Sequence, residues 1–525
     1  MTESTPVAAP ETVATTPAPP ASDRTGSAVV RPRRWRIVVA ALIPVALLFA
    51  LLAWAFASPV GSSPDEDYHL GSIWCAQGDR AGFCESTGDP GVKLVPKAVT
   101  MAAKCYAFHP DRSGSCPIAD SQQLTETKRG TFNDNGYPPV FYTTMSVFVS
   151  HDVASSVLAM RALNALLFVG LLTALYVLLD RGRRGIVLWG GMVALVPFGM
   201  FIIPSINPSG WASISAITLW LALLGFYEAR SRGRLIGLGA IALVATLMGA
   251  GARSDAATYS VLAMVVVMVL KAERTKRFWL LSLFTLALAV ICVAFYLSGS
   301  QGAVIDPDTA TPLSRHATLA LTLENLLQLP SLWTGNFGLW GLGWLDTAMP
   351  AVVWMPSLTI VAGVAFFGLR YGSMRKSIAL GLVGLALIVV PLYVLVHDRV
   401  LVGTGVQPRY LYPLVLLFVG VCLWGVNRLG LGMSGLQLII VVGGLWFANH
   451  IALSTNLRRY VTGTNARGLN LDAGVDWWWH LPFGPIWVWV IGSIAFFVAL
   501  AAAAAISWPR GTFGWRGRRA ALVAS

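Results

Sequence analysis

IVVAALIPVALLFALLAWAFASPVGSSPDEDYH, residues 37–69, is the stretch that decides the fold class and points to a candidate site. Residues 37–57 form an apolar run that is long enough to cross a bilayer as a helix. Asp65, Glu66, Asp67 and His69 follow, where that helix would leave the lipid. Three adjacent carboxylates indicate either a catalytic or cation-binding cluster at the membrane surface or a solvated acidic loop that flanks the helix.

The composition of the chain excludes a soluble protein. Of its 525 residues, 55% are hydrophobic and only 12% are charged, and the mean hydropathy is +0.65; soluble domains carry about 25% charged residues. The apolar runs predict an all-α polytopic bundle of about twelve transmembrane spans. We place these spans at 37–57, 154–179, 186–203, 210–227, 235–251, 256–270, 278–298, 349–369, 377–396, 411–427, 434–452 and 486–507.

The basic residues predict the orientation of the bundle. If the N-terminus is cytoplasmic, the inner side holds 23 of the 38 Lys and Arg but only 6 of the 25 Asp and Glu. This is the positive-inside pattern, so the net charge of +13 is not a nucleic-acid footprint. We expect a disordered cytoplasmic tail at 1–34, a transmembrane domain at 35–508 and a basic cytoplasmic tail at 509–525. The long outer loops would be 58–153, 299–348, 397–410 and 453–485.

Four of the six cysteines lie in the first outer loop, where an oxidising compartment favours disulfides. A zinc site is the alternative, but the loop contains no Cys-x-x-Cys motif. Among the three possible connectivities, we favour pairing between nearest neighbours, Cys75 with Cys84 and Cys105 with Cys116.

Further charged residues are predicted to lie at the same outer face. Arg161 falls near the outer end of the second span, Arg253 and Asp255 in a short outer turn, Asp346 in the long outer loop at 299–348, and Arg409 just before a span. Each alone is typical of interfacial anchoring. Together with the acidic cluster, they indicate a functional site at one depth of one face.

The chemistry expected there is transfer from a lipid-linked donor. The chain has no Gly-rich phosphate loop for a nucleotide sugar, and an outward-facing enzyme needs a donor that has already crossed the membrane. A polyprenyl-phosphate sugar fits that requirement. Asp65 or Glu66 would deprotonate the acceptor hydroxyl, and we favour Glu66 because one helical turn would place it beside His69. Arg409, Arg253 and Arg161 would bind the lipid phosphate.

The other acidic groups have supporting roles in this hypothesis. Asp67, His69, Asp255 and Asp346 would orient the main groups. A divalent cation is a possible cofactor, held by Asp65, Glu66 and His69.

Several motifs in order resemble a bacterial membrane family known as domain of unknown function 2142. They are Pro64-Asp65-Glu66 with His69, Tyr137-Pro138-Pro139, the run from Asn336 to Asp346 and Gln407-Pro408-Arg409-Tyr410. An acidic cluster after the first span also resembles the GT-C superfamily of lipid-phosphosugar glycosyltransferases. Only Asp65, Glu66 and Asp67 match that superfamily's acidic motif. The resemblance implies a GT-C-like bundle and glycosyl transfer.

The sequence therefore favours a membrane glycosyltransferase that uses a polyprenyl-phosphate sugar and an envelope glycan or lipid acceptor at the outer face of the cytoplasmic membrane. A transporter or flippase of a lipid-linked glycan is the first alternative, in which the arginines would bind the headgroup. A non-catalytic envelope assembly protein is the second. Transport would favour carboxylates within the spans, and the chain has almost none there.

Overall fold

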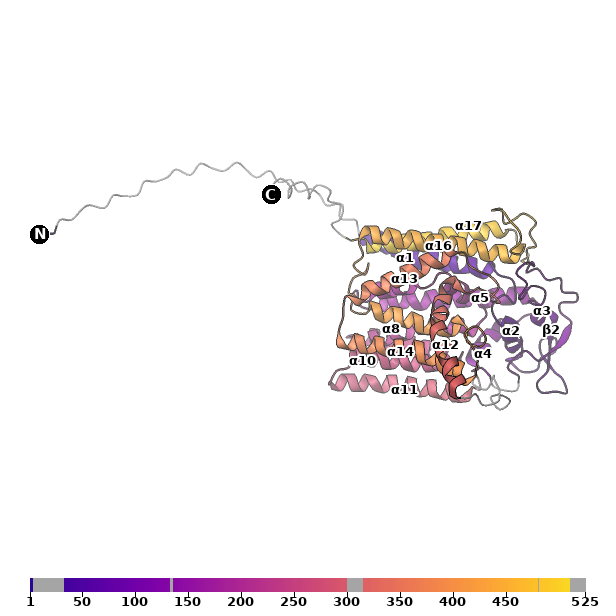
Figure 1. Cartoon of the computed structure of the whole chain (residues 1–525), viewed down its shortest axis with the longest axis horizontal. Helices are drawn as coiled ribbons and strands as arrows, with labels where there is room; N and C mark the ends of the chain where they lie inside the picture. Colours follow the sequence, from indigo (N-terminus) through magenta and orange to yellow (C-terminus); the bar gives the residue numbers. More distant parts are fainter. Residues whose placement is uncertain (3–32, 133–135, 300–314, 480, 510–525) are drawn as a thin grey trace.

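Ten long helices lie side by side in the computed structural model, which describes residues 1–2, 33–132, 136–299, 315–479 and 481–509 (Figure 1). Each is long and apolar enough to cross a membrane, which confirms the polytopic all-α bundle. They are α1 (Arg33–Phe56), α5 (Val153–Leu178), α8 (Pro208–Glu228), α9 (Arg232–Ala250), α10 (Ser254–Lys271), α11 (Lys276–Ser298), α13 (Ala351–Leu369), α14 (Met374–His397), α16 (Gly435–Val461) and α17 (Pro485–Ser507). The tails expected at 1–34 and 509–525 lie almost entirely outside the described residues.

Two of the twelve predicted spans take a different form. The first is α15 (Pro408–Leu423), a helix of 16 residues that is almost wholly buried among its neighbours. The span expected at 186–203 is instead broken into η2 (Ile186–Gly190), α6 (Gly191–Val193) and α7 (Phe198–Ile202). Pro197 interrupts it because proline has no N–H to donate to the helix.

The broken segment still passes through the bundle. At one end the indole N–H of Trp189 donates to Ser507, the last residue of α17 (3.1 Å). At the other end the carbonyl of Ile206 accepts from the hydroxyl of Ser63, just before α2 (3.4 Å). Ten of the twelve predicted spans are thus long helices among the described residues, and the other two are the short α15 and this broken segment.

The first long loop forms a small folded layer at one end of the bundle, which we call the α2 end (Figure 1). Its helical elements are α2 (Glu66–Cys75), α3 (Lys97–Thr100), α4 (Val140–Met145) and η1 (Ser146–Phe148). An antiparallel sheet in the order β1-β2-β3 joins β1 (Glu85–Ser86), β2 (Lys93–Pro96) and β3 (Leu124–Thr127). These short strands are an addition to the predicted all-α fold.

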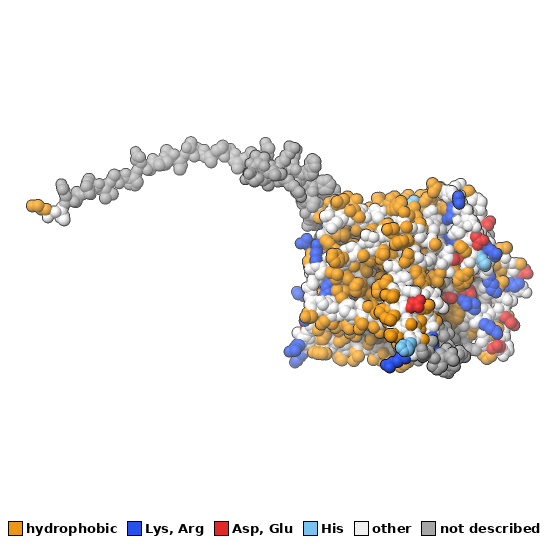
Figure 2. Space-filling view, in the orientation of Figure 1, with side chains coloured by type: hydrophobic (Ala, Val, Ile, Leu, Met, Phe, Trp, Pro, Cys, Tyr) orange, Lys and Arg blue, Asp and Glu red, His pale blue; other side chains and the backbone are white. Residues whose placement is uncertain are grey.

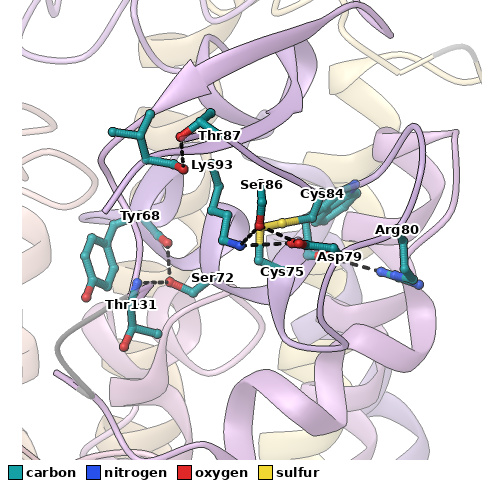
Figure 3. Close-up of a disulfide and its surroundings, with 12 residues drawn as sticks. Tyr68, Ser72, Cys75, Asp79, Arg80, Cys84, Ser86, Thr87, Lys93 and Thr131 are labelled. Carbon is teal, nitrogen blue, oxygen red and sulfur yellow. Dashed lines mark hydrogen bonds and ion pairs between the residues drawn. A yellow bond between two sulfur atoms is a disulfide. The ribbon is translucent and has the colours of Figure 1, made fainter. Parts of the chain in front are cut away.

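Both predicted disulfides are confirmed, Cys75–Cys84 and Cys105–Cys116. Figure 3 shows how the first ties the last residue of α2 to the start of the sheet. Beside it, Lys93 of β2 forms an ion pair with Asp79 (2.9 Å). The disulfide therefore holds the C-terminal end of the helix whose N-terminal end carries the acidic cluster.

A further helix, α12 (Arg315–Thr334), runs across the direction of the long helices and leads into η5 (Gly335–Leu339) (Figure 1). Asn325 of α12 donates to the carbonyl of Val400 and accepts from the N–H of Val402, both at 2.9 Å. Further along, the indole of Trp344 donates to the carbonyl of Gly61 (3.0 Å). The second long outer loop, expected at 299–348, is thus packed against the turn that precedes α2.

The surface agrees with a membrane-embedded bundle. Figure 2 shows hydrophobic side chains over much of the lateral surface, and charged side chains mostly toward the two ends of the long helices. On α11, Trp279, Leu280, Leu283 and Leu286 are each more than half exposed. In a membrane these side chains would contact lipid.

Candidate active site at the start of helix α2

The site is organised by an unusual turn. Asp65 immediately precedes α2 and has left-handed backbone angles, with φ 58° and ψ 22°. Few non-glycine residues adopt this conformation, although Asp does so more readily than most. The Asp65 side chain does not cap the helix. The turn is closed instead by Glu66, whose carboxylate accepts from the N–H of Ser63 (2.8 Å).

Glu66 forms a buried ion pair with Arg161 of α5. The two side chains are 0% and 1% exposed, and their closest N–O distance is 3.1 Å. Arg161 also donates to the backbone carbonyls of Ala55, Ser58 and Pro59, at 2.6–2.8 Å. The pair therefore joins the end of α1 to the turn and to α5, and its carboxylate has no access to solvent.

Asp65 points to the opposite side, where its carboxylate is 40% exposed and lies between two arginines. One oxygen is 2.6 Å from Nη2 of Arg409, and the other is 3.3 Å from Nη2 of Arg129. Arg129 also forms a bidentate ion pair with Asp67, with Nε–Oδ2 and Nη2–Oδ1 distances of 2.5 and 3.0 Å. Burial alone would raise the pKa of Asp65, but Arg409, together with His69 and Arg129, lowers it below its usual value. Asp65 is therefore ionised at neutral pH.

Arg409 is the group whose hydrogen bonding is incomplete. Its side chain is only 4% exposed. Nη2 donates to Asp65 and to the hydroxyl of Tyr410 (3.0 Å). Nε and Nη1 are buried and have no hydrogen-bond partner among the described residues. Oε1 of Gln407 is unpaired in the same way. Buried charged donors without acceptors are rare and costly, so this guanidinium has capacity for an anionic ligand.

A small pocket lies beside the two residues that carry these unpaired atoms. Pro64, Trp340 and Leu342 line it together with Gln407 and Arg409. The pocket therefore joins the acidic turn, the second long outer loop and the start of α15, three parts of the chain that are far apart in the sequence.

A second arginine, Arg253, lies on the same side of the cluster. It forms a bidentate ion pair with Asp255, with Nη2–Oδ2 and Nε–Oδ1 distances of 2.7 and 2.8 Å. Its guanidinium also lies over the ring of Tyr410, 4.7 Å from the centroid, and 5.8 Å from that of Tyr137. Tyr410 therefore contacts both Arg253 and Arg409. The aromatic ring fixes two cations beside the carboxylate of Asp65.

His69 is a neutral part of this cluster. Its Nδ1 is 3.0 Å from the hydroxyl of Tyr142, and its ring packs edge-on against that of Tyr137. Burial lowers the pKa of His69 to about 3, although Asp65 opposes the shift. Glu66 and His69 therefore have different partners, although the sequence predicts them side by side.

Asp346 belongs to a different cluster. Its carboxylate is 2.7 Å from Nη2 of Arg459, and both side chains are buried. Arg459 also donates to the carbonyls of Tyr106 and Arg112, at 2.7 and 2.8 Å. Asp346 thus ties the second long outer loop to α16 and to the loop that carries the second disulfide.

The residues do not fit the predicted cation site. Glu66 points to Arg161 while Asp65 and Asp67 are paired with Arg129 and Arg409, so each carboxylate already has a cationic partner. Within the described ranges, no three His, Cys, Asp or Glu side chains lie close enough to hold a metal ion. We therefore assign no step to a metal.

Sequence reasoning missed two members of the site. Arg129 lies in the first long loop, 64 residues from Asp65, and carries no local signal beyond the adjacent Lys128. Tyr142 lies on α4, in an apolar run that is typical of an interfacial helix. Tyr137 and Tyr410 belong to motifs that carry the family resemblance, but the sequence analysis assigned them no role in the site.

Comparison with known proteins places the chain in a family without assigning an activity. None of the curated proteins matches the chain, and none of the solved structures does either. The family model DUF2142, described as a predicted membrane protein, matches residues 31–418. The matched region contains α1, the turn at Asp65 and Arg409, and it covers about three quarters of the 525 residues. The chain therefore belongs to the DUF2142 family of membrane proteins.

Proposed function

We propose that this chain is a glycosyltransferase of the GT-C type, which transfers a sugar from a polyprenyl-phosphate donor at the outer face of the cytoplasmic membrane. The acceptor would be an envelope glycan or lipid. The observation that carries the proposal is Arg409, a buried arginine with two unpaired donors, which lies 2.6 Å from an exposed, ionised carboxylate. An anion-binding group beside a base is what transfer from a lipid phosphate needs.

In this mechanism Asp65 is the base. The acceptor hydroxyl oxygen attacks the anomeric carbon of the donor, and its proton passes to the Asp65 carboxylate. The bond between the anomeric carbon and the phosphate oxygen breaks, and its electron pair leaves with the polyprenyl phosphate. Nε and Nη1 of Arg409 would hold that phosphate, because planar guanidinium donors match phosphate oxygens. When Arg409 binds the donor, its hold on Asp65 weakens and the carboxylate becomes more basic.

The surrounding pairs act as positioning groups. The Glu66–Arg161 pair fixes the turn from inside the protein, so we assign neither of these residues to proton transfer or phosphate binding. Asp67 orients Arg129, Asp255 orients Arg253, and neutral His69 with Tyr142 supports α2. Arg253 and Arg129 remain candidates for a second contact with the donor phosphate or its sugar.

The transporter alternative has less support. In the described spans, acidic residues lie only at helix ends, as Glu228 and Asp255 do. Coupled transport commonly uses carboxylates deeper in the membrane. We also propose that the α2 end faces outward, because disulfides form on the oxidising side of the membrane.

Arg409→Lys tests the phosphate assignment. Purified protein would be titrated with polyprenyl phosphate in lipid nanodiscs. We expect at least a tenfold loss of affinity, because an ammonium group cannot reproduce the two-point grip. Arg458→Lys is the matched control, since Arg458 lies at the end of α16 and donates to Gly468 and Asn470 outside the cluster. Equal affinities for the two variants would remove Arg409 from the donor site.

A further inference from the structure

A second polar cavity lies at the end of the bundle opposite Asp65. Helix α8 connects the two regions. Asn207, just before its first residue, donates to the carbonyl of Pro64 (2.8 Å), whereas Tyr227 and Glu228 at its other end line the cavity. A helix of 21 residues is about 30 Å long. The cavity measures about 610 Å³, a volume typical of small-molecule sites.

The lining of this cavity carries excess positive charge. Five cationic side chains face three carboxylates, and they come from the ends of four helices and three connecting loops. The cations are Arg183, Arg230, Arg234, Lys271 and Arg277, and the acids are Asp180, Glu228 and Glu273.

Part of this charge is held in a fixed frame. Glu228 accepts from Arg183 at 2.8 and 3.2 Å and lies 3.4 Å from Lys271. Arg234 pairs with Asp180 at 2.7 Å. These ion pairs form part of the cavity wall, and the carboxylates neutralise most of the positive charge of the paired cations.

Two arginines remain without a carboxylate partner among the described residues. Arg277 donates to the backbone carbonyl of Ala229, and in the described structure Glu273, the third acid of the lining, forms no ion pair with it. Arg230 is exposed at the mouth of the cavity. The lining therefore offers two guanidinium groups against a pre-organised polar wall, which is suited to a phosphate-bearing anion.

The cavity also borders the lipid-facing surface. Phe278 and Leu281 of α11 belong to its lining, while the adjacent Trp279, Leu280 and Leu283 are 62–66% exposed on the same helix. A headgroup could thus enter the cavity while its acyl chains remain against α11. Basic pockets between transmembrane helices are known to bind anionic headgroups.

We propose that this cavity is a binding site for a phosphate-bearing anion, with the headgroup of an anionic phospholipid as the favoured source. The site is separate from the candidate active site and does not depend on the proposed glycosyl transfer. Arg230 and Arg277 bind the phosphate, and the Arg183–Glu228–Lys271 frame holds the cavity open.

The test compares two double variants with the same change in charge. Arg230→Ala/Arg277→Ala removes the two arginines proposed to bind the phosphate, whereas Arg181→Ala/Arg274→Ala removes two arginines from neighbouring loops that do not line the cavity. Native mass spectrometry of detergent-solubilised protein would measure binding of phosphatidylglycerol, phosphatidylcholine and inorganic pyrophosphate. From about 1 kcal/mol for each basic residue near an anionic surface, we expect roughly 30-fold weaker phosphatidylglycerol binding for the first variant. The control should match the wild type.

A second measurement uses only the wild-type protein, so that it does not depend on the variant folding. Phosphatidylglycerol should slow hydrogen–deuterium exchange at 226–236 and 271–281. Binding of pyrophosphate without a preference for phosphatidylglycerol over phosphatidylcholine would identify a soluble phosphate compound as the source and would support the site itself. Equal affinities of the two double variants for both anions, or no protection of these segments by either phosphatidylglycerol or pyrophosphate, would overturn the proposal.

Discussion

Glu66→Gln and Asp65→Asn are the same chemical change at adjacent positions, yet the structure predicts opposite consequences. Glu66 and Arg161 are 0% and 1% exposed, so glutamine would leave a buried guanidinium without its counter-charge. The side chain of Asp65 is 40% exposed, so in Asp65→Asn water can replace part of the lost interaction with its arginine partners. We therefore expect Glu66→Gln to affect stability and Asp65→Asn to affect transfer.

The magnitudes follow from the partners of each group. Breaking a buried ion pair by removing one member costs about 3–5 kcal/mol. Arg161 keeps three backbone carbonyl acceptors, so we expect the lower end, about 3 kcal/mol, for Glu66→Gln. Partly exposed pairs contribute about 0–1 kcal/mol, so Asp65→Asn should change stability by less than about 1 kcal/mol. Loss of a general base should slow transfer roughly 10²–10⁴-fold.

Two assays separate the effects. SDS titration in mixed micelles gives the free energy of unfolding, and the envelope glycan profile of a deletion strain gives transfer at matched protein levels. The reasoning is refuted if Glu66→Gln retains its stability and abolishes transfer, because Glu66 would then belong to the chemistry. Full complementation by Asp65→Asn would remove Asp65 as the base.

Three further changes test the supporting groups. Cys75→Ser/Cys84→Ser should cost roughly 2–3 kcal/mol because it opens a short loop, measured by SDS unfolding; an unchanged free energy would mean that the disulfide does not stabilise α2. Since the folded pKa of His69 is about 3 and an unfolded His titrates near 6.5, the unfolded state binds more protons between these values. Stability should therefore fall as pH drops below about 6.5, and His69→Gln should flatten that fall in thermal melts; an identical pH profile would contradict burial of the neutral ring. Asp67→Asn should reduce transfer less than Asp65→Asn, because Asp67 only orients Arg129; an equal loss would give Asp67 a direct role.

Patterns that depend on neighbouring residues were predicted well. The apolar runs locate the ten long helices because each run is itself a helix that is long and apolar enough to cross a membrane. Nearest-neighbour pairing of Cys75, Cys84, Cys105 and Cys116 is confirmed. The span at 186–203 was predicted as a regular helix because its hydropathy does not show the interruption at Pro197. The segment is buried among other helices, which supply the hydrogen-bond partners for the interrupted backbone that lipid could not.

The site was predicted in composition but not in pairing. The sequence predicts seven charged groups at one face: Asp65, Glu66, Asp255, Asp346, Arg161, Arg253 and Arg409. The structure brings Asp65, Arg409 and the Arg253–Asp255 pair together, buries Glu66 with Arg161, and places Asp346 with Arg459 in another cluster. Which arginine meets which carboxylate depends on contacts more than 90 residues apart, such as Arg161 with Glu66 and Arg409 with Asp65. No local pattern contains that information, so the sequence assigned Arg161 to the phosphate and overlooked Arg129.

The left-handed conformation of Asp65 explains why adjacent carboxylates have different surroundings. A regular helical start at residue 65 would leave Asp65 and Glu66 as successive residues of one exposed turn. The sequence alone therefore favoured Glu66 as the base, because of its spacing to His69. With φ at 58°, the chain reverses just before α2. Glu66 then enters the protein toward α5, while Asp65 faces Arg409 and Arg129. This conformation costs on the order of 1–3 kcal/mol, and the buried Glu66–Arg161 pair is the contact that holds the turn in place. The ion pair that is inaccessible to substrate is thus what positions the accessible carboxylate.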